Sequence, residues 1–65
     1  MQVIINGKPT LLAEPITVAT LLQQLDIDGK VAVEINRTIV PRSTFAQHRI
    51  NDGDTLEIVR AIGGG

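Results

Sequence analysis

The chain has 65 residues and a formal net charge of −1, and it lacks cysteine, which limits it to one small domain without disulfides, thiolate metal sites or a catalytic thiol. It contains one Phe, no Trp, no Tyr and no long run of charge, a composition that argues against nucleic acid as a partner. No segment resembles a signal peptide and no apolar run could span a bilayer, so we expect a soluble, cytoplasmic protein with no membrane partner.

The N-terminal segment predicts a β-hairpin. Gln2–Asn6 begins with alternating apolar and polar residues, which is typical of a strand. Asn6-Gly7 is a strong signal for a tight turn, because both residues tolerate positive φ. We expect the returning strand at Thr10–Glu14, with either Leu11 or Leu12 facing inward.

An amphipathic helix is predicted after Pro15. Thr17 is a good N-cap, and apolar residues then recur at the helical spacing i, i+3, i+4 and i+7, which are Val18, Leu21, Leu22 and Leu25. Ile16 and Leu21 have the spacing of a hydrophobic staple across the cap. We expect Asp28-Gly29 to end the helix, with Gly29 in the left-handed conformation.

A second hairpin follows the helix. Val31–Asn36 alternates again, which predicts a strand with Val31, Val33 and Ile35 inward and Ala32 and Glu34 outward. Asn36-Arg37 indicates a tight turn into a short edge strand, Thr38–Val40. Pro41 is expected to stop that strand.

The last third of the chain predicts a single helical turn, a β-turn and a final strand. Ser43 is the expected cap of one helical or 3₁₀ turn that brings Phe45 into the core. Asn51–Asp54 is dense in turn-forming residues. Thr55–Ala61 is the predicted final strand, and its inward and outward residues are Leu56 and Ile58, and Glu57 and Val59, respectively.

This order of elements indicates an α+β fold. One amphipathic helix needs an apolar surface, and the inward faces of four or five short strands supply it. With two hairpins formed from the earlier strands, the last strand must lie centrally to complete a mixed sheet. The prediction is a β-grasp, or ubiquitin-like, roll over residues 1–62, with one main helix packed on one face of the sheet and a flexible glycine tail at residues 63–65.

The three final residues are Gly63, Gly64 and Gly65. Glycine loses more conformational freedom on folding than any other residue, so three in a row add nothing to stability. A tail without side chains can pass extended through a narrow channel in another protein and present the carboxylate of Gly65. The alternative interpretation is a frayed end without a role.

Several segments together resemble the ThiS family, the small ubiquitin-like sulfur carriers of thiamine biosynthesis. The resemblance covers essentially the whole chain. The segments that carry it are the opening strand with its Asn turn, Thr17–Leu22, Ala32–Asn36, Ile39–Arg42, Ala46–His48, Asp52–Asp54 and the glycine end. The third glycine is a departure, since many members end in two.

The resemblance implies a carrier, not an enzyme, with no permanently bound cofactor. In that family a ubiquitin-activating-type adenylyltransferase (ThiF-like) uses ATP to adenylate the terminal carboxylate, here that of Gly65. Sulfur from a donor protein then displaces the adenylate and leaves a thiocarboxylate. A thiazole synthase (ThiG-like) takes that sulfur for the thiazole ring of thiamine.

The remaining candidate residues divide into a docking surface and turn-forming residues. Val59, Ile62 and Glu57 form a hypothetical docking patch for a partner protein, although a plain solvated charge is the simpler interpretation of Glu57. His48 has no flanking nucleophile or carboxylate, which indicates a solvated side chain. Asp52-Gly53-Asp54 lacks the further oxygen ligands of a calcium loop, so we predict no metal site and interpret it as a turn, with acidic contacts to a partner as a secondary role.

Three alternative functions stay open at this point. The small subunit of molybdopterin synthase uses the same tail chemistry for a different acceptor, although such relatives usually run longer. A ubiquitin-like modifier would form isopeptide bonds with lysines of other proteins. A passive binding module of the same fold would have a tail without a role.

Overall fold

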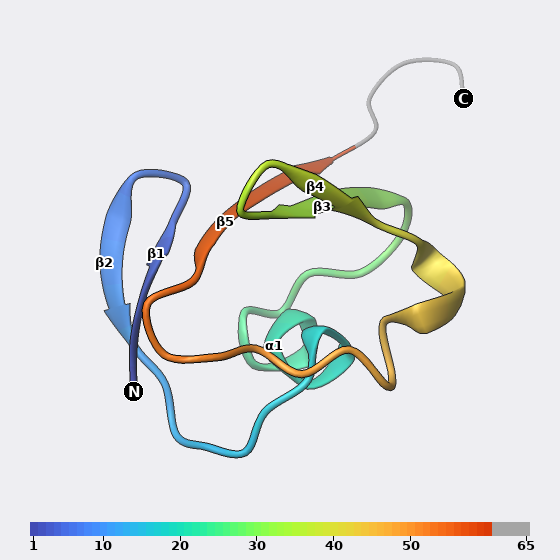
Figure 1. The fold of residues 1–65 in the computed structure, drawn as a ribbon. Coiled ribbons are helices and arrows are strands. Elements are labelled where there is room, and N and C mark those ends of the chain that lie inside the picture. Colours follow the sequence, from blue (N-terminus) through green and yellow to red (C-terminus); the bar gives the residue numbers. More distant parts are fainter. Residues whose placement is uncertain (61–65) are drawn as a thin grey trace.

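The computed structural model describes residues 1–60 as five strands, one α-helix and one 3₁₀ turn. The strands form a single sheet in the order β2-β1-β5-β3-β4, and α1 lies on one side of it (Figure 1). The elements are β1 (Gln2–Ile5), β2 (Lys8–Leu11), α1 (Val18–Gln24), β3 (Val31–Ile35), β4 (Thr38–Val40), the 3₁₀ turn η1 (Arg42–Thr44) and β5 (Thr55–Arg60). The predicted β-grasp fold with one main helix is confirmed, whereas the predicted boundary at residues 62 and 63 and the predicted tail lie outside the described residues.

The last strand, β5, occupies the centre of the sheet, as the element order predicted. It runs parallel to β1, with Ile4 opposite Thr55, and antiparallel to β3, with Val33 opposite Ile58. Both kinds of pairing therefore meet on β5, and the sheet is mixed. Arg60, the last described residue, therefore stands at the end of the central strand and not of an edge strand.

The core lies between α1 and the inward face of the sheet. On the helix the spacing of Val18, Leu21 and Leu22 places all three on one buried stripe. Full burial of one such side chain stabilises a fold by about 1.5–3 kcal/mol. The complete buried cluster consists of Val3, Leu12, Ile16, Val18, Leu21, Leu22, Val31, Val33, Ile35, Val40, Ile50, Leu56 and Ile58. The predicted inward residues of β3 and β5 all belong to it.

The first hairpin differs from the prediction in its second strand, which spans Lys8–Leu11 and not Thr10–Glu14. Met1 and Leu12 exchange both backbone hydrogen bonds, and hydrogen-bonded pairs alternate along an antiparallel ladder. The Ile4–Pro9 pair is therefore a non-hydrogen-bonded one, and the missing donor of Pro9 faces the free edge of the sheet. Of the two candidate inward leucines, Leu12 is buried and Leu11 is exposed.

The helix starts where the sequence predicts. Thr17 is the N-cap, and its side-chain oxygen accepts a hydrogen bond from the backbone N–H of Thr20 at 3.3 Å. Ile16 and Leu21, the predicted staple pair, are both buried. The cap therefore fixes the first turn, while the two apolar side chains fix how the chain enters the helix.

The predicted end of the helix is wrong, because α1 stops at Gln24, well before Asp28-Gly29. Asp26, with φ of 58°, takes the capping position expected for Gly29. Gly29 has the predicted left-handed conformation, with φ of 82°, but it lies in the loop after the helix. The N–H of Ile27 donates to the carbonyl of Leu22 at 2.9 Å and that of Asp26 to Gln23 at 3.1 Å, which is a Schellman motif. This early stop turns the half-buried Ile27 back onto the core.

Leu25, predicted to lie on the buried stripe, is the C-cap residue and is 40% exposed. In the second hairpin, Asn36 and Arg37 both have positive φ, 53° and 68°, as a two-residue turn of type I′ requires. This confirms the predicted turn, and β4 is the predicted edge strand.

The segment after β4 confirms a 3₁₀ turn but not its cap. The turn begins directly after Pro41, no side chain caps it, and Ser43 lies inside it, so the predicted Ser43 cap is wrong. The fixed φ of Pro41, −61°, already directs the chain into the turn. Phe45 then packs against the core while staying partly exposed.

Candidate functional site

The functional candidate of this chain is the C-terminal segment and the strand that carries it. Gly63, Gly64, Gly65 and Ile62 lie outside the described residues, so their roles stay predictions. The structure does describe β5, which leads into that segment, and it shows how firmly the strand is held and which surface surrounds it (Figure 1).

Asn6 holds β5 on the side of β1. The first strand ends at Ile5, one residue before its ladder would reach the backbone of Ile58. The side chain of Asn6 takes over at that point: its Oδ1 accepts from the N–H of Ile58 at 2.8 Å, and its Nδ2 donates to the carbonyl of Ile58 at 3.1 Å. A side-chain amide thus replaces the peptide group that the missing strand residue would have offered.

Asn36 holds β5 in the same way on the side of β3. Its backbone N–H donates to the carbonyl of Thr55 at 2.8 Å, and its side-chain Oδ1 accepts from the N–H of Thr55 at 3.0 Å. Its Nδ2 donates to Asp54 at 3.0 Å. Asn6 and Asn36 both stand at positive φ in hairpin turns, so each turn also ties a neighbour of β5 to that strand.

The side of the sheet that faces away from α1, here called the outward face, carries exposed apolar side chains. Val59 of β5 is 59% exposed and Ile39 of β4 is 70% exposed. Ile4 and Leu11 are exposed apolar residues of β1 and β2. Glu57 and Val59, both proposed for the docking patch, are exposed as predicted and lie two residues apart on one face of β5, while their role in docking stays a prediction.

The sequence did not predict that Glu34 lies next to Glu57 on this face. It predicted that Glu34 and Glu57 face outward, and the structure confirms this, with Glu34 half-buried and Glu57 exposed. It did not reveal that the two residues are directly opposite each other in the β3–β5 ladder. The alternation within each strand predicts which face of the sheet a side chain lies on. Which residues lie opposite each other depends on the register between strands, which is set by residues far apart in sequence.

The turn residues Asp52 and Asp54 serve the fold, as predicted. Asp52 accepts from the N–H of Gln2 at 2.7 Å. Asp54 is buried, and its second carboxylate oxygen accepts from the N–H of Asn51 at 2.8 Å. Burial makes Asp54 unsuitable for the secondary role of acidic partner contact, which only the exposed Asp52 could still fill.

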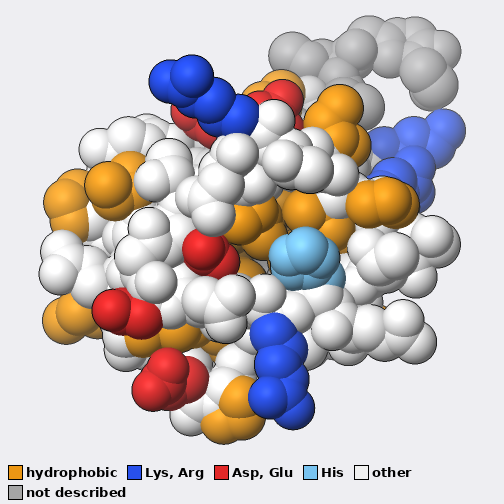
Figure 2. Space-filling view, in the orientation of Figure 1, with side chains coloured by type: hydrophobic (Ala, Val, Ile, Leu, Met, Phe, Trp, Pro, Cys, Tyr) orange, Lys and Arg blue, Asp and Glu red, His pale blue; other side chains and the backbone are white. Residues whose placement is uncertain are grey.

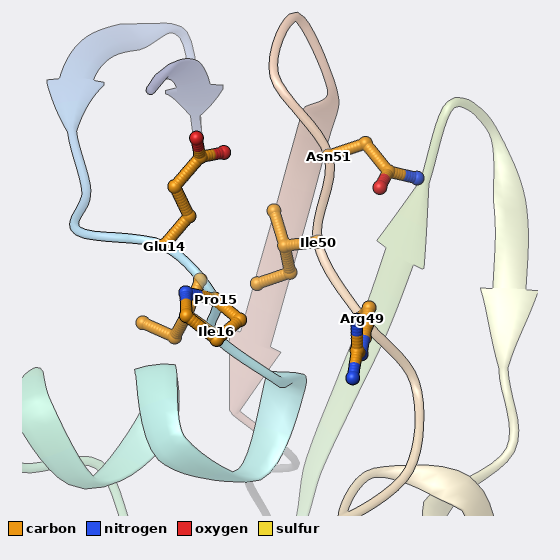
Figure 3. A pocket seen from close by; sticks show the side chains of 6 residues that line it. All are labelled: Glu14, Pro15, Ile16, Arg49, Ile50 and Asn51. Carbon is orange, nitrogen blue, oxygen red and sulfur yellow. The ribbon is translucent and has the colours of Figure 1, made fainter.

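A hollow lies between the segment before α1 and the segment before the last turn. Its floor includes the buried Ile16 and Ile50, and Glu14 and Arg49 stand on opposite sides of it (Figure 3). The carboxylate of Glu14 and the guanidinium of Arg49 extend in different directions and do not converge on one point (Figure 3). His48 is an exposed residue outside this hollow. The hollow therefore offers no nucleophile with an adjacent base, which acyl or phosphoryl chemistry within the chain would need.

Charged side chains of both signs are scattered over the molecular face shown in Figure 2. Among residues 1–60 no group of three His, Cys, Asp or Glu side chains is arranged to hold a metal ion. The only α-helix in that range is far too short to cross a membrane.

Comparison with known proteins identifies relatives over the full length. The model of the ThiS family matches residues 3–65. The sulfur carrier protein ThiS of Escherichia coli is 41% identical over 66 aligned positions that cover all of both chains. The crystal structure of the thiamine biosynthesis protein ThiS from Geobacter metallireducens superposes with a TM-score of 0.85 at 35% identity, again over all of both chains.

A second kind of relative is longer. A thiazole synthase of Paramagnetospirillum magneticum is 52% identical over 66 aligned positions, which are all of this chain but 20% of that protein. A thiazole synthase of Magnetococcus marinus matches at 36% identity with the same shares. The chain thus spans one fifth of the length of these two relatives.

Proposed function

Because the chain belongs to the ThiS family, we propose that it is a sulfur carrier of thiamine biosynthesis and that it holds sulfur as a thiocarboxylate on Gly65. The observation that carries the proposal is the family match, which runs to residue 65 and so includes all three glycines. This favours a functional glycine segment over a frayed end. It also supports a carrier role, with catalysis left to partner enzymes.

The chemistry suits a glycine end. A terminal carboxyl has an ordinary pKa of about 3.3–3.7 and is ionised at neutral pH. One carboxylate oxygen attacks the α-phosphate of ATP, pyrophosphate leaves, and an acyl adenylate forms. A hydrosulfide-level sulfur from the donor then attacks the acyl carbon, the bond to AMP breaks, and the thiocarboxylate remains. Glycine has no side chain to hinder either attack, and Gly64 allows close approach of an active-site wall.

The partners follow from this sequence of steps. A ThiF-like adenylyltransferase would supply the ATP chemistry, and a sulfur donor protein would supply the sulfur. The acceptor enzyme is a thiazole synthase, which the similarity of the whole chain to parts of two thiazole synthases supports. The same observation favours thiazole over molybdopterin as the destination of the sulfur.

The docking patch predicted from the sequence belongs to this proposal. Glu57 and Val59 lie on the outward face of β5, close in sequence to Ile62 and the glycines. A partner that holds this patch has the reactive end within reach, since five extended residues after Arg60 span about 16–18 Å at about 3.3–3.6 Å each. Val59→Asp should therefore slow adenylation of the carrier, whereas an unchanged rate would remove Val59 from the patch.

The decisive experiment is intact-mass analysis of the protein purified from its own cells. We expect a fraction of the molecules to end at Gly65 with one oxygen replaced by sulfur, localised by fragmentation to that residue. Deletion of Gly65 should abolish the modified species and thiazole formation, which a passive binding module would survive. A native chain that extends beyond Gly65 without being trimmed would overturn the proposal, and isopeptide conjugates with other proteins would favour a modifier.

A further inference from the structure

Two acidic side chains face each other at the centre of the outward face. Glu34 of β3 and Glu57 of β5 are direct partners in the antiparallel ladder. The even-numbered residues of β3 direct their backbone groups to β5, as the hydrogen bond from Asn36 to Thr55 shows, so this is a hydrogen-bonded pair with Cα atoms about 5.5 Å apart. The two side chains therefore leave the sheet side by side on the same face.

No basic residue occupies the ladder positions beside this pair. On the β4 side, Glu34 is opposite Ile39. On the β1 side of β5, the next position belongs to Asn6, whose amide is engaged with the backbone of Ile58. Like charges directly opposite each other destabilise a sheet. The isolated domain thus carries a repulsion at this position that its neighbouring strand residues do not relieve.

Apolar side chains border the acidic pair. Val59 follows Glu57 on the same face of β5 and is 59% exposed, and Ile39 beside Glu34 is 70% exposed. Ala32, opposite Val59, is also exposed. A partner surface that complements this area is apolar and carries one cationic side chain at its centre. Burial between apolar surfaces makes such a charge pair stronger than it would be in water.

We propose that the outward face docks the adenylating enzyme and that an Arg or Lys of that enzyme inserts between Glu34 and Glu57. The inference rests on the proposed function, because the occupant is the protein that must process Gly65. The short reach of the segment after β5, about 16–18 Å, requires that protein to contact the surface around the end of β5. Of that surface, the outward face combines exposed apolar area with an acidic pair that has no basic residue directly opposite it in the ladder.

The proposal predicts opposite effects on docking and on stability. Glu34→Gln and Glu57→Gln each remove the repulsion within the free carrier, so the thermal midpoint of each variant should equal or exceed that of the wild type. The same changes remove a contact with the partner cation. In the ATP–pyrophosphate exchange reaction of the adenylating enzyme, the double variant should show a KM for the carrier raised about tenfold, which corresponds to about 1.4 kcal/mol.

Glu14→Gln combined with Asp28→Asn is the matched control for the double variant, because it changes net charge by the same amount at two exposed positions outside the sheet. The difference in KM between the double variant and this control should become smaller as the ionic strength rises from 0.05 to 1 M, because the screening length then falls to about 3 Å. The proposal would be overturned if the double variant had the same KM as the control at low salt, or if it had a lower thermal midpoint than the wild type. Absence of exchange with the wild-type carrier would instead overturn the proposed function.

Discussion

Asn6→Gly tests whether a side-chain amide completes the central strand. The change removes the hydrogen bonds of 2.8 and 3.1 Å to Ile58, while glycine keeps the left-handed backbone at no steric cost. Each bond contributes about 0.5–1.5 kcal/mol, and the added freedom of glycine in the unfolded chain costs about 0.4–1 kcal/mol more. We expect the free energy of unfolding to fall by about 2–3 kcal/mol, out of a total of about 3–10 kcal/mol for a domain of this size.

Urea titration followed by circular dichroism measures this loss, and the thermal midpoint should fall by about 10–20 °C. Asn51→Gly, at an exposed turn position, controls for the unfolded-state term and should cost only about 0.4–1 kcal/mol. In amide exchange the N–H of Ile58 should lose protection more than that of Leu56. Equal losses for the two glycine variants would show that the amide of Asn6 contributes nothing to holding β5.

Three further changes probe the fold around this strand. Asp54→Ala should lower the free energy of unfolding by about 2–3 kcal/mol, because it leaves the backbone N–H of Asn51 and the side-chain amide of Asn36 without their buried acceptor. Urea titration measures this loss. Asp26→Gly should raise that free energy by about 0.5–1 kcal/mol, since glycine suits the left-handed position and an acidic charge leaves the helix C-terminus; no gain over Asp26→Ala would contradict this. Leu56→Ala should lower the free energy of unfolding by about 2–5 kcal/mol, because it leaves a cavity in the core. Leu11→Ala should lower it by less than about 0.5 kcal/mol, because Leu11 is exposed.

Periodicity was sufficient for β3 and β5, each of which buries one face. The alternation in Val31–Ile35 and Thr55–Arg60 predicted both strands and their inward residues, because each lies between a core and the outward face. The start of α1 was equally readable, since Thr17 caps it and the apolar stripe begins at once. The central place of β5 followed from the two hairpins, because strands that are consecutive in sequence usually pair with each other and the last strand must then lie between the hairpins.

The ends of helices and strands that depend on tertiary contacts could not be predicted from the sequence. Gly29 is the better left-handed residue, yet Asp26 ends the helix, because stopping there turns Ile27 onto the core. Two favourable hydrogen bonds of the Schellman motif and an apolar contact outweigh the modest preference of glycine over aspartate. In the first hairpin, strand pairing starts directly after the turn and includes Pro9, since its missing donor falls on the free edge.

The exposed residues of the candidate docking patch on β5 were predictable from the sequence, whereas the role of Gly65 stays a prediction. The two asparagines that hold β5 were not predictable, because Asn6 contacts Ile58 across 52 positions and reads locally as nothing more than a turn residue. The pairing of Glu34 with Glu57 is a matter of strand register, which no local pattern encodes.

The central position of β5 and the proposed docking face have a joint consequence for the kinetics of the carrier. A partner bound to the outward face holds the domain at the root of the segment that carries Gly65, which makes delivery of the carboxyl group an intramolecular step. Short flexible links of this kind give effective concentrations in the millimolar range. Weakening the face then lowers the population of docked carrier without changing the chemistry once docked, so changes at Glu34 and Glu57 should appear in KM and not in kcat.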